Sequence, residues 1–98
     1  MDYELAIVGA GPAGYSAAIY AVRSGIKTII FDKGLGGGLA AISPNIENYT
    51  GFESISGIEL TEKMKAHVRK YTKINFNEEV KKISKKYDNF YIETDKRV

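Results

Sequence analysis

One glycine-rich segment constrains the fold of this chain more than any other sequence feature. It stands at residues 9–14, between an apolar run at 4–8 and an alanine-rich helical pattern at 15–24. Pro12 suits the start of that helix and Gly25 suits its end. Residues 27–31 are β-branched and aromatic, which favours a second strand. Strand, glycine turn, helix and strand within about 30 residues predict a βαβ unit with a right-handed crossover.

Dinucleotide binding requires glycine at each of the three motif positions, for a different physical reason at each one. Gly9 permits the tight turn, Gly11 lets the backbone approach a pyrophosphate, and Gly14 allows close packing of helix and strand. The helix N-terminus presents unpaired N–H groups and a partial positive charge to phosphates. Asp32, at the end of the second strand, would accept hydrogen bonds from a ribose 2′-OH and repel a 2′-phosphate. The alternative is a plain strand-to-helix turn with Asp32 exposed, but the ordered context favours a dinucleotide site.

The first strand is also expected to be buried. Residues 4–8 form a short apolar run without alternation, which is typical of a parallel strand covered on both faces. Residues 33–57 contain seven glycines or prolines and no periodic run. So long a segment without regular structure is uncommon in a compact domain and is usually functional.

The C-terminal half predicts a helix, a short strand and a hairpin. Ser56 can cap a helix over residues 58–71, with Glu59 completing a capping box. A short strand is expected at 74–76, and a hairpin around a turn at Asp88-Asn89. The apolar stripe of the predicted helix consists of Leu60, Met64, Val68 and Tyr71.

Composition excludes several classes of function. The 98 residues include no cysteine and one histidine, His67, so the chain has no disulfide, thiolate metal site, cysteine nucleophile or multi-histidine metal site. No apolar run approaches the roughly 20 residues that cross a bilayer. Asp2 and Glu4 stand where a signal peptide would be basic, so we expect a cytoplasmic protein with no membrane partner.

Charge is distributed unevenly along the chain. Residues 1–60 carry three bases and six acids, whereas residues 61–98 carry eleven bases and six acids, giving −3 and +5. A basic half can indicate nucleic-acid binding. Here the lysines alternate with acids and apolar residues, which favours a solvated lysine-rich surface and no nucleic-acid partner.

Three motifs together resemble the N-terminal FAD-binding part of the thioredoxin reductase family, with the archaeal members closest in character. They are Gly-Ala-Gly-Pro-Ala-Gly at 9–14, Gly-Gly-Leu-Ala at 37–40 and Ile-Glu-Asn-Tyr-Thr-Gly-Phe at 46–52. The similarity continues to about Ile83 and covers most of the chain. It implies an α/β fold: a Rossmann-like βαβ FAD-binding domain with a parallel sheet, followed by a β-hairpin.

The resemblance also implies roles for individual residues. The first motif would hold the FAD pyrophosphate, Asp32 and Lys33 would border the ribose, and Asn48 would approach the flavin. Leu39 departs from a frequent polar residue and Thr50 from a usual proline, which removes a side-chain contact and loosens a turn. The implied cofactor-binding residues are Gly9, Ala10, Gly11, Pro12, Ala13, Gly14, Asp32, Lys33, Gly37, Gly38, Leu39, Ala40, Asn48 and Val80.

By the same resemblance, the complete protein would be an NAD(P)H-dependent flavoprotein disulfide oxidoreductase with a thioredoxin-like partner. In this family the nicotinamide site and the Cys-x-x-Cys pair lie in a second domain. Residues 1–98 are therefore expected to be a partial FAD-binding domain that binds FAD, holds no catalytic or metal-binding residue, and is inactive alone. Open strand edges would favour a homo-oligomer. Two alternatives stay open: the FAD segment of a ferredoxin–NADP reductase-like flavoprotein without a dithiol, and a non-enzymatic adenine-nucleotide-binding module.

Overall fold

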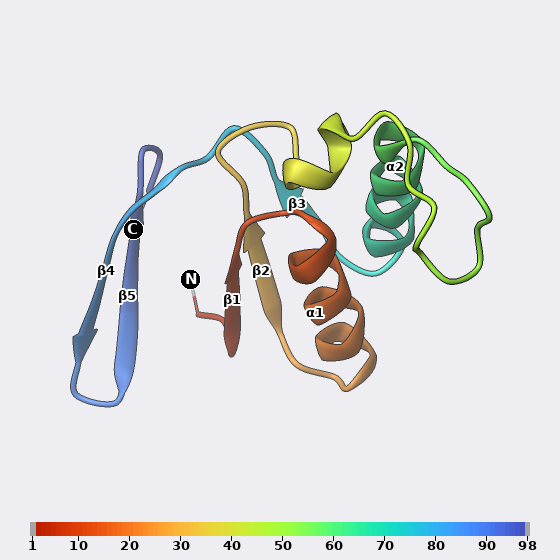
Figure 1. The fold of residues 1–98 in the computed structure, drawn as a ribbon. Helices are drawn as coiled ribbons and strands as arrows, with labels where there is room; N and C mark the ends of the chain where they lie inside the picture. Colours follow the sequence, from red (N-terminus) through yellow and green to blue (C-terminus); the bar gives the residue numbers. More distant parts are fainter. Residues whose placement is uncertain (1, 98) are drawn as a thin grey trace.

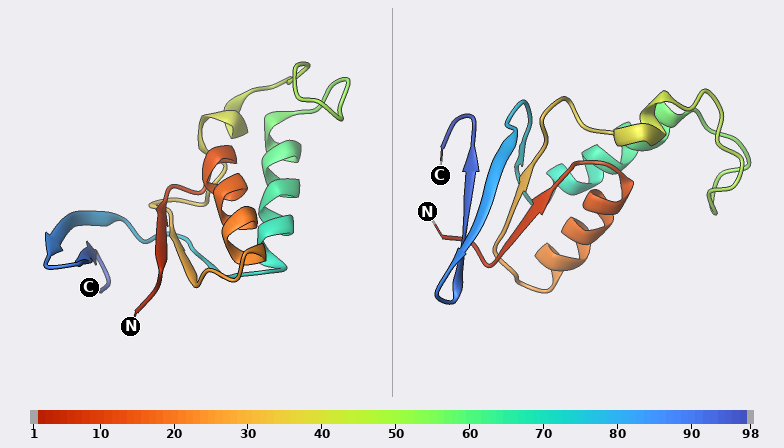
Figure 2. Two further views of the ribbon diagram at one scale, coloured as in Figure 1. Left: turned by 90° about the horizontal axis from the view of Figure 1, so that it is seen from below. Right: turned by 60° about the vertical axis from the view of Figure 1, so that its left-hand side comes forward.

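A three-stranded parallel sheet with both helices on one face forms the main body of the molecule (Figure 1). A computed structural model describes residues 2–97. A two-stranded hairpin lies on the other side of the sheet (Figure 2). The predicted α/β class is confirmed. The elements in chain order are β1 (Leu5–Val8), α1 (Pro12–Arg23), β2 (Thr28–Phe31), the 3-10 helix η1 (Gly38–Ile42), α2 (Gly57–Arg69), β3 (Ile74–Asn75), β4 (Val80–Lys86) and β5 (Asn89–Thr94).

The sheet has the order β1-β2-β3, with every pair parallel. Leu5 of β1 is paired with Thr28 of β2, and Ile30 of β2 is paired with Ile74 of β3. All four residues of the central strand β2 are buried. Parallel strands end at the same edge, so the loops that follow β1, β2 and β3 lie close together.

The expectation that β1 is buried is wrong. Leu5 and Val8 are exposed, Val8 by 56%, while Ala6 and Ile7 are half-buried. Within residues 2–97 the strand β1 pairs only with β2, so its second edge faces solvent. The apolar composition of β1 is therefore compatible with burial on both sides, but within residues 2–97 no other element covers the exposed side of the strand.

The hydrophobic core lies between the sheet and the two helices. Its central members come from the loop after β1, from both helices and from strands β2 and β3, and they are Ala10, Tyr15, Ala18, Ile30, Val68 and Ile74. On α2, Leu60 and Val68 are buried and Met64 packs against the core, as the apolar stripe predicts. Tyr71 is exposed, because α2 ends at Arg69 and Tyr71 lies in the turn beyond it.

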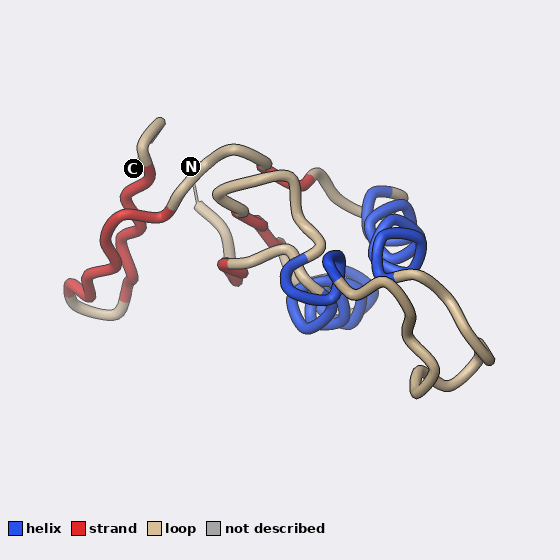
Figure 3. Tube along the Cα trace, turned by 45° about the horizontal axis from the view of Figure 1, so that its top comes forward, coloured by secondary structure: helices blue, strands red, loops and turns tan. Residues whose placement is uncertain are grey.

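The long segment 33–57 contains more regular structure than its sequence predicts. It includes η1 and an isolated antiparallel bridge in which Ile46 and Ile55 exchange two hydrogen bonds of 2.7 and 3.0 Å. Figure 3 shows the loop between η1 and α2 extending beyond both helices. At its end the side chain of Ser56 accepts a hydrogen bond of 3.1 Å from the amide of Glu59, so the predicted cap is confirmed.

The C-terminal hairpin forms as predicted, but its turn is one residue earlier. Lys86 pairs with Asn89, so the two turn residues are Tyr87 and Asp88. Tyr87 has a φ of +58°, a conformation that few residues other than glycine adopt.

No helix within residues 2–97 is long and apolar enough to cross a bilayer.

Candidate functional site

Two glycine-rich loops meet at the edge of the sheet where the parallel strands end. The first glycine loop is residues 9–14, which run from the end of β1 into the first turn of α1, and the second is residues 34–38, which run from β2 to the start of η1. The amide of Gly37 donates a hydrogen bond of 2.6 Å to the carbonyl of Ala10. A Cβ atom placed on Gly11 would lie 3.6 Å from the Cα of Gly38. The two loops therefore face each other with no side chain between these positions.

Two of these glycines are required by the backbone itself. A Cβ on Gly14 would lie 2.0 Å from the carbonyl oxygen of Gly9, which no other residue type could avoid. This is the close packing of helix and strand that the sequence predicts for the third glycine of the motif. Gly37 has a φ of +92°, a conformation that favours glycine.

The N-terminus of α1 opens into the space between the loops. Its N-cap residue is Gly11, which has no side chain to accept a hydrogen bond, and the first turn has no acidic residue. Pro12 follows as the first helical residue. Helices usually cap these amides with a Ser, Thr, Asp or Asn side chain. Here the first-turn amides and the positive end of the helix dipole remain available to an anion.

The carboxylate of Asp32 connects the two loops. Its Oδ1 accepts a hydrogen bond of 2.9 Å from the amide of Ala10, in the first loop. Its Oδ2 accepts hydrogen bonds of 3.0 Å from the amides of Gly34 and Gly36, in the second loop. A carboxylate has about four lone-pair sites, so three are used by backbone amides and one remains for a further donor.

The sequence model of the family "Pyridine nucleotide-disulphide oxidoreductase" matches residues 3–98. The chain belongs to this family. Loops of this kind at the start of a βαβ unit bind the pyrophosphate of a dinucleotide. FAD is the cofactor that the family and its solved members imply.

Several thioredoxin reductases are similar to this chain. The crystal structure of the T. acidophilum enzyme matches it with a TM-score of 0.94 and 48% identity, over 98% of this chain and 32% of that one. Thioredoxin reductase of Bacillus subtilis (strain 168) is 46% identical over 69 residues, which are 70% of this chain and 22% of the relative. A ferredoxin-flavin thioredoxin reductase from Clostridium acetobutylicum matches with a TM-score of 0.86 and 38% identity, over 99% of this chain and 34% of that one.

This chain spans about a fifth of the length of the relative from Bacillus subtilis and about a third of the two solved structures. The similarity lies in the N-terminal FAD-binding region of these proteins. The predicted resemblance to that part of the thioredoxin reductase family is therefore confirmed.

The fold gathers most of the other residues implied by the family resemblance near the two loops. Lys33 is exposed beside Asp32, and Leu39 and Ala40 lie in η1, directly after the second loop. Val80 begins β4, two residues after Glu78, whose amide donates a hydrogen bond of 2.9 Å to the carbonyl of Asp32.

Asn48 is the one implied residue that lies elsewhere. It belongs to the loop between η1 and α2, which projects away from the first glycine loop (Figure 1). FAD is an extended molecule whose flavin is separated from the pyrophosphate, so a flavin contact of Asn48 stays a prediction. Two shallow hollows elsewhere lie along Arg69–Phe76 and around Arg97, and neither includes a glycine-loop residue.

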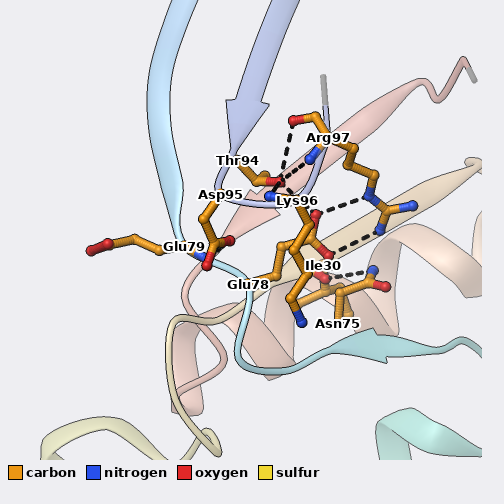
Figure 4. Close-up of polar contacts among 8 residues, drawn as sticks. All are labelled: Ile30, Asn75, Glu78, Glu79, Thr94, Asp95, Lys96 and Arg97. Carbon is orange, nitrogen blue, oxygen red and sulfur yellow. Dashed lines mark hydrogen bonds and ion pairs between the residues drawn. The ribbon is translucent and has the colours of Figure 1, made fainter.

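A partly buried ion pair between Arg97 and Glu78, beside the site, has no signal in the sequence. Glu78 is buried at the end of the segment after β3, and Arg97 donates hydrogen bonds of 2.9 and 3.3 Å to its two carboxylate oxygens (Figure 4). Thr94 donates a third of 2.7 Å. Burial alone would raise the pKa of Glu78, but the hydroxyl of Thr94 and the guanidinium of Arg97 hold that pKa below its ordinary value. The cluster ties the base of the hairpin to the sheet.

Tyr15 is a second residue that the sequence reading missed. It directly follows the third glycine of the motif, and the sequence indicates only that it belongs to the alanine-rich helical pattern at 15–24. Its side chain is in the core, yet its hydroxyl is directed towards the second glycine loop.

Among the residues that the structure describes, no group of three or more His, Cys, Asp or Glu could hold a metal ion.

Proposed function

We propose that the two glycine loops bind the pyrophosphate of FAD in a thioredoxin reductase-like, NAD(P)H-dependent flavoprotein disulfide oxidoreductase. The observation that carries the proposal is the uncapped N-terminus of α1 facing a second loop of glycines. A Cβ at Gly11 or Gly38 would fill the space between the loops, and glycine at both positions keeps it open. The residues present therefore fit a bound pyrophosphate.

The role of this chain would be to bind and orient the cofactor. When bound, FAD supplies a carrier that accepts two electrons from a nicotinamide and passes them to a disulfide. The first-turn amides of α1 would hold the phosphates, and the free lone pair of Asp32 would accept a ribose hydroxyl. Backbone near Val80 would lie beside the adenine, and Asn48 beside the flavin. Lys33, Leu39 and Ala40 would border the ribose and the ribityl chain.

The activity of the whole protein is part of the same proposal. The names of the similar proteins support a disulfide reductase with a thioredoxin-like partner. We propose in addition a cytoplasmic location and a homo-oligomeric working form, the latter because β1 has an unpaired edge within residues 2–97. Similar folds occur in a thioredoxin reductase and in a ferredoxin-flavin thioredoxin reductase. An FAD segment of a ferredoxin–NADP reductase-like protein is the less supported alternative, because the similar proteins named above are thioredoxin reductases.

Calorimetric titration of the 98-residue chain with FAD, NAD and ADP tests cofactor binding. We expect FAD to bind more tightly than NAD, and tighter NAD binding would contradict the assignment. Gly11→Ala should weaken FAD binding by about tenfold or more, because the methyl group enters the space that the pyrophosphate needs. Ser24→Ala is the control: Ser24 is exposed and lies at the opposite end of α1 from the proposed site. Equal affinities in the two variants would place the ligand elsewhere.

The chain alone should not reduce disulfides. A reductase of this kind passes electrons through a pair of cysteines, and this chain has none. We expect no NADPH-dependent reduction of a disulfide dye by the pure 98-residue chain with FAD added. Measurable turnover would show that the reaction does not need a dithiol on the same polypeptide.

A further inference from the structure

The hydroxyl of Tyr15 is a buried polar group without a partner. The side chain is 2% exposed, and within residues 2–97 its hydroxyl proton has no acceptor and its oxygen no hydrogen-bond partner of normal geometry. Buried polar atoms in folded proteins nearly always have a partner, and an unpaired one destabilises the conformation that contains it. A phenylalanine would fill the same core position without that penalty, so the hydroxyl itself needs an explanation.

The hydroxyl lies at the junction of the two glycine loops. A Cβ on Gly36 would be 2.5 Å from the Tyr15 oxygen and 3.2 Å from the carbonyl oxygen of Ala10. That carbonyl already accepts the amide of Gly37. Burial raises the pKa of Tyr15 and the negative charges of Asp32 and Glu62 raise it further, whereas the backbone amide of Gly37, a donor close to the hydroxyl, lowers it. The phenol is therefore a neutral proton donor that is held against the second loop without an acceptor.

We propose that Tyr15 is a positioning residue whose hydroxyl gains its hydrogen bond when a dinucleotide binds between the loops. This inference rests on the proposed function. Gly36 and Gly37 both have positive φ, so the second loop can shift at little steric cost. A ligand that fixes this loop, or a water held between loop and phosphate, supplies the missing acceptor. The hydroxyl then favours the bound conformation over the free one without contacting the ligand, which strengthens binding.

Tyr15→Phe tests the inference, with Tyr20→Phe as the matched control. Tyr20 lies on the same helix, α1, and is 75% exposed. The unfolding midpoint without ligand and the Kd for FAD and for ADP would be measured on the 98-residue chain. We expect Tyr15→Phe to be at least as stable as the parent without ligand, yet to bind both ligands about tenfold more weakly, equivalent to about 1.4 kcal/mol. Tyr20→Phe should change neither quantity.

A merely structural hydroxyl would not give these opposite effects. A lower midpoint of Tyr15→Phe without ligand would overturn the inference, because it would show that the hydroxyl already has a partner in the free protein. An unchanged Kd for FAD, with tight binding by the parent chain, would also overturn the inference but leave the proposed function intact. If the parent chain bound neither FAD nor ADP, the proposed function and the inference would fail together.

Discussion

Removing the guanidinium of Arg97 should release the base of the hairpin from the sheet. Arg97 bridges the chain end after β5 to Glu78, with Nε 2.9 Å from Oε2 and Nη2 3.3 Å from Oε1 (Figure 4). Its guanidinium carbon also lies 5.5 Å from the centroid of the Phe31 ring, on the central strand. These contacts join a hairpin whose side chains are mostly exposed to the buried part of the molecule.

The magnitude follows from what Arg97→Ala leaves behind. The side chain of Glu78 is 5% exposed, and it would keep only the hydrogen bond from Thr94. Truncating one partner of a fully buried ion pair costs about 3–5 kcal/mol. The side chain of Arg97 is 36% exposed, so water can replace part of its interaction. We therefore expect about 2 kcal/mol, which is a roughly 30-fold shift towards the undocked hairpin.

Amide hydrogen exchange measured by NMR can detect this local opening. A detached two-stranded hairpin is marginally stable in water, so protection of β4 and β5 should fall by roughly 30-fold. Protection of β2 should not change. In a Glu78→Gln background the same Arg97→Ala change should cost far less, because no buried charge is left unpaired. Lys81→Ala, which breaks an exposed ion pair with Glu79, is the control and should leave the hairpin protected.

Two results would refute this reasoning. Unchanged protection of the hairpin in Arg97→Ala would show that other contacts hold it to the sheet. An equal loss of protection in the hairpin and in β2 would show that the ion pair stabilises the whole fold rather than the docking of one element.

Three further predictions concern the loops and the buried carboxyl. Gly14→Ala should destabilise the chain by more than about 3 kcal/mol, because its Cβ would collide with the carbonyl of Gly9; a soluble variant with the parent's thermal midpoint would contradict this. The pKa of Glu78 is below its ordinary value of 4.5 in the folded chain, so its contribution to stability is present above that pH and is lost as the pH falls further. Hairpin protection should therefore be constant from pH 7 to about 5 and fall below about pH 4.5, and constant protection down to pH 3 would argue against this role. Asp32→Asn should lower the unfolding free energy by about 2 kcal/mol, measured in urea, because an amide nitrogen replaces an acceptor of backbone amides. It should weaken the binding of ADP more than that of 2′-deoxy-ADP, because only ADP offers the 2′-hydroxyl that Asp32 is proposed to accept. An equal effect on both ligands would show that Asp32 acts only by holding the two loops together.

The parts of the fold that the sequence predicts are those set by local chemistry. Glycines at fixed spacing, a proline at a helix start and a serine cap each restrict the backbone within a few residues, and the structure has α1, β2 and α2 where these signals predict them. The predicted turn of the hairpin, Asp88-Asn89, lies one residue after the observed turn, because Asp and Asn both favour turns and the sequence alone does not fix the register. The pairing of Lys86 with Asn89 is a property of the whole hairpin.

What the sequence could not predict depends on neighbours far along the chain. The exposure of β1 depends on whether a second strand pairs with it, which its own composition does not record. Glu78 and Arg97 are separated by 19 residues and carry no motif. The sequence predicts that Asp32 is a polar partner at the end of β2. It does not show that three backbone amides would reach the carboxylate first.

Within residues 2–97 one edge of β1 has no strand partner, and such an edge can pair with a strand supplied by another polypeptide. Main-chain hydrogen bonds would provide the affinity, and the incoming strand would cover side chains such as Val8. The chain is therefore a natural candidate for one half of a split-protein reporter, in which recovered cofactor binding signals that two polypeptides have met. A variant with a lysine on the same edge would be the negative control, because a charged side chain there disfavours the pairing of an added strand.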